Sequence, residues 1–176
     1  MVDLEELKKI KVPKAMIKKM FPPKKSLYTL DTTGDGSIDS VKVSALNVFM
    51  PLGVPSQETI GDVDIDALNP SDYGTLLLDG EEIDISKDSK NVSLLKDSLK
   101  VYHKDEVFSI EDILAGKMEG RTIAMGDEIS VVFKLDESVL SKLTKGKHTL
   151  TVESDKIPTL EIGFELTDKN MNQTLS

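Results

Sequence analysis

The chain has 176 residues, a net charge of −9, no cysteine, no tryptophan and a single arginine. The absence of cysteine excludes disulfides, thiol catalysis and every zinc or iron–sulfur site built from cysteine. An acidic chain with few aromatic side chains is a poor ligand for nucleic acid, because that binding depends largely on neutralising phosphates and stacking bases. We therefore expect no nucleic-acid partner.

The charge is divided unevenly along the chain. Residues 1–25 hold eight lysines and three acidic residues, a balance of +5, whereas the remaining residues hold 14 basic and 28 acidic groups, a balance of −14. No run approaches the roughly 20 apolar residues of a transmembrane helix. Residues 1–6 lack a basic region leading into an apolar stretch, the start of a secretory signal. We expect no transmembrane segment and a cytoplasmic location.

Residues 1–25 predict a basic helical segment. Asp3 caps a first helix, with Glu6 at the capping-box position. Pro13 suits the first residue of a second helix, and Pro22-Pro23 ends it. One face of the second helix is apolar and carries Met16, Ile17, Met20 and Phe21. That face packs on the acidic body of the same chain, which the opposite charges favour, or the segment docks on an acidic partner or an anionic membrane surface.

From residue 26 the hydrophobic period changes to two, the period of strands with one buried face. The clearest alternating segments are 41–45, 129–135, 148–152 and 160–166, and shorter strand candidates are 60–66, 99–104 and 121–125. Asp79 and Gly80 predict a hairpin turn between two apolar runs. Ser109 begins a short helix that Gly116 ends, and residues 136–143 predict another.

These elements predict a mainly β fold, an antiparallel β-sandwich over residues 26–166 with two short helical insertions; an open barrel is the alternative. Residues 167–176 are expected to form a polar, loosely held C-terminal tail. Residues 143–152, Leu-Thr-Lys-Gly-Lys-His-Thr-Leu-Thr-Val, resemble a stretch of immunoglobulin-like sandwiches in which a turn with the pattern Gly-x-His-x-Leu-x-Val leads into a late strand. The resemblance implies an immunoglobulin-like or related sandwich and says nothing about activity.

The segment 31–39, Asp-Thr-Thr-Gly-Asp-Gly-Ser-Ile-Asp, carries a pattern with metal chemistry in it. Calcium takes six to eight oxygen ligands, which alternate residues of a tight loop supply. The pattern resembles the calcium loop of EF-hand and dockerin proteins. The resemblance implies side-chain ligands from Asp31, Thr33, Asp35 and Asp39, a backbone carbonyl ligand from Ser37, and a sharp turn at Gly36.

The resemblance ends at the twelfth position, where Lys42 replaces the expected carboxylate, and the flanking residues favour strands over helices. Two alternatives stay open. A β-hairpin presents the loop to a Ca²⁺ ion and a distant carboxylate completes the shell, or glycine and aspartate form a plain tight turn. Asp62, Asp64 and Asp66 are candidates for the distant carboxylate. The alternative is a solvated strand face, or an edge strand that like charge protects from pairing with other chains.

The sequence does not single out a catalytic centre. It contains neither a Gly-x-Ser-x-Gly elbow nor a phosphate-binding glycine loop. His103 and His148 are expected to be partly buried strand residues, and Arg121 a surface residue rather than an anion clamp. A further acidic group is expected to be a solvated face; it comprises Glu81, Glu82, Asp84 and Asp88.

The sequence therefore favours a non-catalytic binding or assembly module, with a structural calcium ion if the loop holds one. Its partner is another protein or a second copy of the chain. One alternative is an enzyme or small-ligand-binding protein whose site is scattered over the sandwich loops. The other is a peripheral interaction protein that acts through its basic N-terminal helix.

Overall fold

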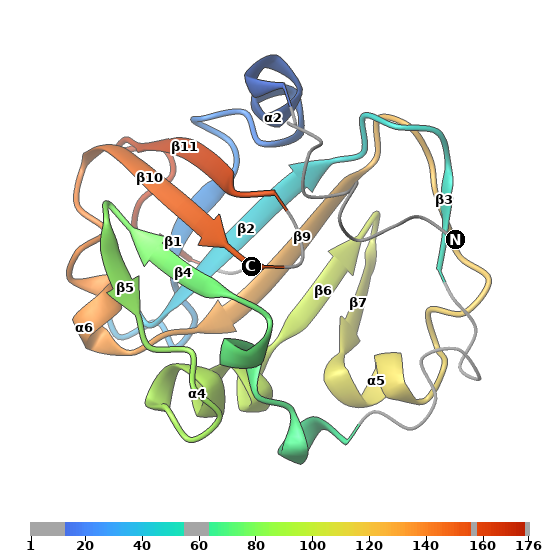
Figure 1. The fold of residues 1–176 in the computed structure, drawn as a ribbon, viewed down its shortest axis with the longest axis horizontal. Coiled ribbons are helices and arrows are strands. Elements are labelled where there is room, and N and C mark those ends of the chain that lie inside the picture. The colour runs from blue at the N-terminus through green and yellow to red at the C-terminus, as the bar shows by residue number, and fades with distance from the viewer. Residues whose placement is uncertain (1–12, 55–63, 156–157, 175–176) are drawn as a thin grey trace.

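The computed structural model describes residues 13–54, 64–155 and 158–174 (Figure 1). Within these ranges the fold is mainly β, as predicted, with several sheets and four α-helices. The largest sheet has six strands in the order β12-β1-β2-β9-β6-β7. All its neighbours are antiparallel except β1 and β12, which are parallel. The strands are β1 (Leu27–Asp31), β2 (Ser40–Leu46), β6 (Lys100–His103), β7 (Glu106–Ser109), β9 (Glu128–Lys134) and β12 (Gln173–Thr174).

A second, fully antiparallel sheet has four strands in the order β11-β10-β4-β5. Asp79 and Gly80 join β4 to β5 with φ angles of 52° and 84°. Positive φ at both central residues is the requirement of a type I′ hairpin turn, so the predicted hairpin is confirmed. The strands are β4 (Thr75–Leu78), β5 (Glu81–Ile83), β10 (Gly146–Glu153) and β11 (Leu160–Leu166). Two short strands, β3 (Leu52–Gly53) and β8 (Thr122–Ile123), pair separately.

The main core lies between the two larger sheets, which Figure 1 shows one in front of the other. The predicted alternation places apolar side chains of both sheets into it, because every second residue of a strand points to the same face. Helix α6 (Glu137–Leu140) closes one end. The buried core residues are Leu27, Val41, Leu78, Ile83, Val139, Leu140, Leu143, Phe164 and Leu166.

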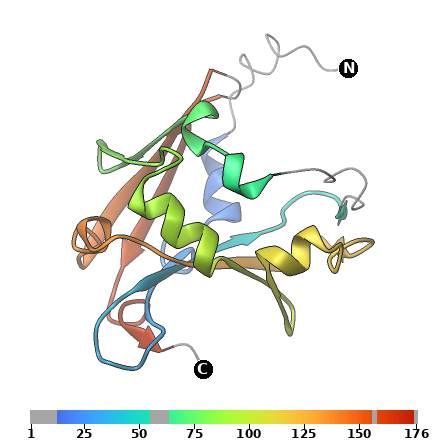
Figure 2. The same cartoon turned by 90° about the horizontal axis from the view of Figure 1, so that it is seen from below.

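The two predicted helical insertions are present. Helix α5 (Ile110–Leu114) begins with a reciprocal capping box between Ser109 and Asp112, and α6 occupies the second predicted position. Helix α4 (Lys90–Ser98), which lies between the two sheets in Figure 2, was not predicted. Its apolar residues are few, so its periodicity in the sequence is weak, and packing of Val92 on the core stabilises it.

The predicted strand 60–66 is wrong in its described part. Asp64 caps a 3₁₀ turn, η1 (Ile65–Ala67), by accepting a hydrogen bond from Asp66 N–H. An aspartate that bonds its own backbone two residues on favours a turn over a strand. A second 3₁₀ turn, η2 (Pro70–Asp72), follows. Residues 60–63, including Asp62, lie outside the described residues.

The two ends of the described chain pack on the body. Helix α2 (Lys14–Met20) follows Pro13, and its predicted apolar face is half-buried against β2 and β11. The predicted first helix lies outside the described residues. The expectation of a loosely held C-terminus is wrong for residues 167–174, because Asn170 is buried and β12 pairs with β1. The polar composition of this segment does not reveal that Asn170 bonds Thr167 N–H and Glu165 C=O.

Candidate functional site

The predicted calcium loop joins β1 to β2, and its carboxylates are engaged by the loop itself. Asp31 Oδ1 accepts hydrogen bonds from the backbone N–H of Thr33 (3.1 Å) and Gly34 (2.8 Å), and Oδ2 accepts one from Gly36 N–H (2.7 Å). Gly34 and Gly36 have φ angles of 79° and 87°. Burial acts to raise the pKa of Asp31, but the hydrogen bonds from Gly36, Gly34 and Thr33 outweigh it and lower that pKa.

The carboxylates of Asp39 and Asp35 also accept hydrogen bonds from nearby groups of the same hairpin. Asp39 accepts hydrogen bonds from the hydroxyl groups of Thr32 (2.7 Å) and Ser40 (2.6 Å). Asp35 accepts one from Ser37 N–H (2.8 Å). The five predicted ligands, Asp31, Thr33, Asp35, Ser37 and Asp39, therefore share one hairpin loop, as predicted.

Among the described residues no group of three or more histidine, aspartate or glutamate side chains is placed to hold an ion. Asp64, a candidate for the distant carboxylate, instead caps η1. The arrangement of the loop as it stands is that of a hydrogen-bonded turn.

His148 on β10 is buried and has an acceptor at each ring nitrogen. Nδ1 lies 2.6 Å from Asp79 Oδ2, and Nε2 lies 2.6 Å from the carbonyl oxygen of Thr144. The ring stacks on Phe164 with 5.4 Å between centroids. Burial acts to lower the pKa of His148, but its hydrogen bonds to Asp79 and Thr144 outweigh burial and raise it. The pair holds the β4–β5 turn against β10.

His103 on β6 is also buried, yet its two neighbours differ in kind. Nε2 lies 2.9 Å from Asp127 Oδ2, and Nδ1 lies 3.1 Å from Arg121 Nη1. A guanidinium can only donate, so Nδ1 accepts from Arg121 and Nε2–H donates to Asp127. Arg121 also pairs with Glu106 and lies over the Phe108 ring, 4.9 Å from its centroid. The prediction of Arg121 as an ordinary surface residue is therefore wrong.

Asp127 and Asn47 together fix two loops at the same corner of the molecule. Asp127 Oδ2 accepts a hydrogen bond from Ala124 N–H (3.0 Å), besides its bond with His103. The amide of the buried Asn47 donates to the carbonyl oxygens of Met50 (3.3 Å) and Ile123 (2.9 Å). Backbone bonds also link Asn47 N–H to Asp127 C=O and Gly126 N–H to Asn47 C=O.

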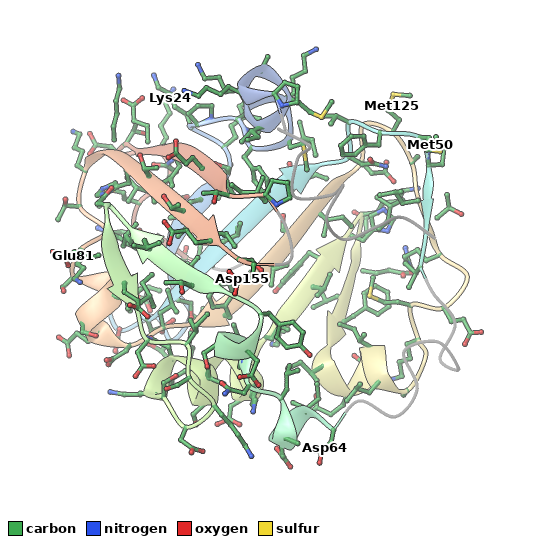
Figure 3. All side chains as sticks on the ribbon, viewed as in Figure 1. Lys24, Met50, Asp64, Glu81, Met125 and Asp155 are labelled. Carbon is green, nitrogen blue, oxygen red and sulfur yellow. The ribbon has the colours of Figure 1, made fainter. Side chains whose placement is uncertain are left out.

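These braced loops display four large apolar side chains to solvent. Phe49, Met50, Leu52 and Met125 are 42%, 74%, 46% and 65% exposed, and we name them the apolar patch. Leu52 is on β3, which pairs with β8 just before Met125. Figure 3 shows Met50 and Met125 at one corner of the molecule. Such groups of exposed apolar side chains mark interaction surfaces more often than chance.

Met125 owes its exposure to a turn that needs glycine. Asp127 N–H donates to Ala124 C=O (3.0 Å), which closes a four-residue turn with Met125 and Gly126 at its centre. Gly126 has a φ of 92°, the conformation of the third residue of a type II turn. The Met-Gly-Asp sequence signals this turn, and the Phe-Met-Pro-Leu run at 49–52 signals the other loop. No local pattern reveals that Asn47 joins them.

The chain matches no protein-family model and no curated protein. In the described part of the chain, no helix is both long and apolar enough to cross a bilayer.

Proposed function

We propose that this protein is a non-catalytic binding module whose apolar patch docks a short apolar segment of a partner protein. The observation that carries the proposal is the bracing of the patch. Asn47 and Asp127 hold both loops through hydrogen bonds. The loops that carry Met50 and Met125 therefore lose little conformational entropy when a partner binds. Preorganisation of this kind raises affinity because less ordering remains to be done on binding.

The size of the patch favours a short segment over a large interface. A standard protein–protein interface takes about 20–30 residues from each side. The apolar patch has four exposed residues, two of them methionines. Methionine side chains are flexible and polarisable and therefore adapt to apolar partners of different shape. A short peptide segment with two or three apolar anchors matches this surface.

The two histidines support binding rather than catalysis. A general base needs a ring nitrogen within reach of the substrate proton. Both ring nitrogens of His103 and both of His148 already have partners inside the protein. Neither histidine offers a nitrogen for proton transfer to a substrate unless its internal bonds break.

The proposal is tested by selecting binders from a displayed library of random peptides on the immobilised protein. We expect apolar peptides whose affinity falls about tenfold or more with the double substitution Met50→Glu and Met125→Glu. Val107, which is 48% exposed on β7 outside the patch, supplies the control Val107→Glu, with unchanged affinity. Selected peptides that bind the double variant as tightly as the original protein would show that the patch is not the docking site.

The calcium ion predicted for residues 31–39 stays a prediction, supported by the resemblance of the loop. In metal-stripped protein a bound Ca²⁺ would raise the melting temperature by several degrees, Mg²⁺ would not, and Asp35→Ala would abolish the rise. Absence of any shift would leave the loop as a hairpin turn.

The finer description of the fold is likewise a proposal. We propose that the two larger sheets form a β-sandwich, and the core shared by β1, β2, β4, β5 and β11 supports it. The immunoglobulin-like assignment and the boundaries at residues 25 and 166 stay predictions of the sequence.

The basic N-terminal segment is a second candidate binding surface. Lys14, Lys18, Lys19, Lys24 and Lys25 are all exposed, and no ion pair among the described residues involves them. Lys24 lies at the opposite end of the molecule from Asp64 in Figure 3. A peripheral role through this segment predicts binding to anionic vesicles that weakens with salt and disappears when the five lysines become glutamine.

A further inference from the structure

The core between the two larger sheets is not completely filled. A cavity of about 180 Å³ lies there, lined almost entirely by apolar side chains of both sheets, α4 and α6. Its one polar lining residue, Asn91, bonds Asp84 C=O (3.1 Å) and Asp136 N–H (3.0 Å) with its amide. Such a cavity offers water few hydrogen-bond partners, and its walls lose the contacts that close packing would supply. We call it the inner cavity.

A second apolar cavity of about 250 Å³ lies beside the first, between α4, α5 and η1. Pro70, Val92 and Leu95 line both cavities. The apolar residues lining only this outer cavity are half-buried rather than buried, so it lies nearer to solvent; they are Ile65, Leu68, Leu99, Ile110, Ile113 and Leu114. Figure 2 shows α4 between the two sheets and α5 beyond it. The two cavities are therefore neighbours, and Pro70, Val92 and Leu95 form part of the wall of each.

Lys96 is the one charged residue among the described residues that line the outer cavity. Its ammonium group donates one hydrogen bond, to the Leu68 carbonyl (3.3 Å), and has no ion pair with a described acidic group. An ammonium has three donors, so two of them have no partner among the described residues and can serve a ligand. A positive group beside an apolar cavity is complementary to a molecule with one carboxylate and an aliphatic chain.

We propose that the two cavities bind one medium-chain fatty acid, its chain in the inner cavity and its carboxylate at Lys96. Cavity size sets the chain length. A cavity of about 150 Å³ takes benzene, which has six carbons, so cavities of about 180 Å³ and about 250 Å³ together set an upper limit of roughly seventeen carbons. Binding fills the core void without burying an unpaired charge.

The first experiment needs only the unmodified protein. Hexanoate, decanoate and octadecanoate are titrated below micelle-forming concentrations, and binding is followed by calorimetry and by the methyl signals of Val92 and Leu78. We expect a stoichiometry of one and an affinity that increases about threefold to fourfold per methylene from hexanoate to decanoate. Octadecanoate, too long for the cavities, is expected to gain nothing further. No heat and no change at these methyl groups with millimolar decanoate would overturn the proposal.

Two substitutions locate the ends of the ligand. Val43→Phe fills part of the inner cavity, which Val43 lines, and is expected to weaken the binding of decanoate about tenfold or more while leaving that of hexanoate unchanged. Lys96→Met is expected to weaken decanoate about tenfold and leave 1-decanol unchanged. Lys100→Met, which removes an exposed lysine at the start of β6, is the matched control. An equal loss of affinity for decanoate and for 1-decanol in Lys96→Met would overturn the assignment of the carboxylate to Lys96. If Val43→Phe does not fold, the chain-length series on the unmodified protein still decides the proposal.

Discussion

His103 and His148 are both buried in strands and both bond an aspartate, yet they lie in different sheets and differ at the second ring nitrogen. The second neighbour of His148 is a carbonyl oxygen, an acceptor, whereas that of His103 is a guanidinium, a donor. An imidazole between two acceptors is most stable with a proton on each nitrogen, and one between a donor and an acceptor is most stable with a single proton in a defined position. A histidine–aspartate pair alone therefore does not define the state of the ring, and the third group has to be known.

The largest effect is expected from removing the ring of His103. His103→Ala leaves Arg121 and Asp127 without their shared partner beneath the braced loops, so we expect the free energy of unfolding to fall by about 3 kcal/mol. Chemical denaturation measures it, with Asp105→Ala at an exposed neighbouring position as the control. A loss under about 1 kcal/mol would mean that His103 does not organise this corner.

The stability of the fold should depend on pH through the pair of His148 and Asp79. The pKa of His148 is raised, so its bonds to Asp79 and Thr144 stabilise the fold fully below about pH 6.5, the ordinary histidine value, and this contribution is lost as pH rises through the folded-state pKa. Burial acts to raise the pKa of Asp79, but the bonds from His148 and Thr149 N–H lower it, so its contribution is lost only as pH falls below about 3.9.

His148→Asn should therefore cost about 1–2 kcal/mol near pH 5 and less near pH 9, and the loss of stability between these values should disappear in the variant. Urea denaturation across this range measures it. An unchanged pH dependence in His148→Asn would assign the proton to another group.

The smallest change in the free energy of unfolding is expected from removing Arg121, which donates to Nδ1 of His103. Arg121→Met removes the hydrogen bond to Nδ1 and the pair with Glu106, and we expect a loss of about 1 kcal/mol because Arg121 is only partly buried. Nitrogen NMR of the ring should show the Nε2–H tautomer in the original protein and a mixture of tautomers in the variant. Lys117→Met, which breaks the exposed pair with Asp112, should change neither property. A mixed tautomer in the original protein would contradict the assigned hydrogen bonds.

The sequence by itself determined the local elements. The period-two alternation placed β2, β9, β10 and β11, the Asp79-Gly80 pair defined a type I′ turn, and Ser109 with Asp112 defined the start of α5. Each of these depends on residues within a few positions of one another, because side-chain direction along a strand and φ preference are local properties. The clustering of five predicted ligands in one hairpin loop is local for the same reason.

Only the tertiary structure decided which side chains serve a common site. Asn47 reaches residues 123 and 124, Arg121 lies between His103 and Glu106, and Lys96 stands beside a cavity lined by α4, α5 and η1. Helix α4 has a capping serine but a weak apolar stripe, so its existence depends on the core that it covers. The sequence shows the carboxylate of Asp31 but not its partners. The backbone N–H groups of Gly34 and Gly36 point to it only in the folded loop.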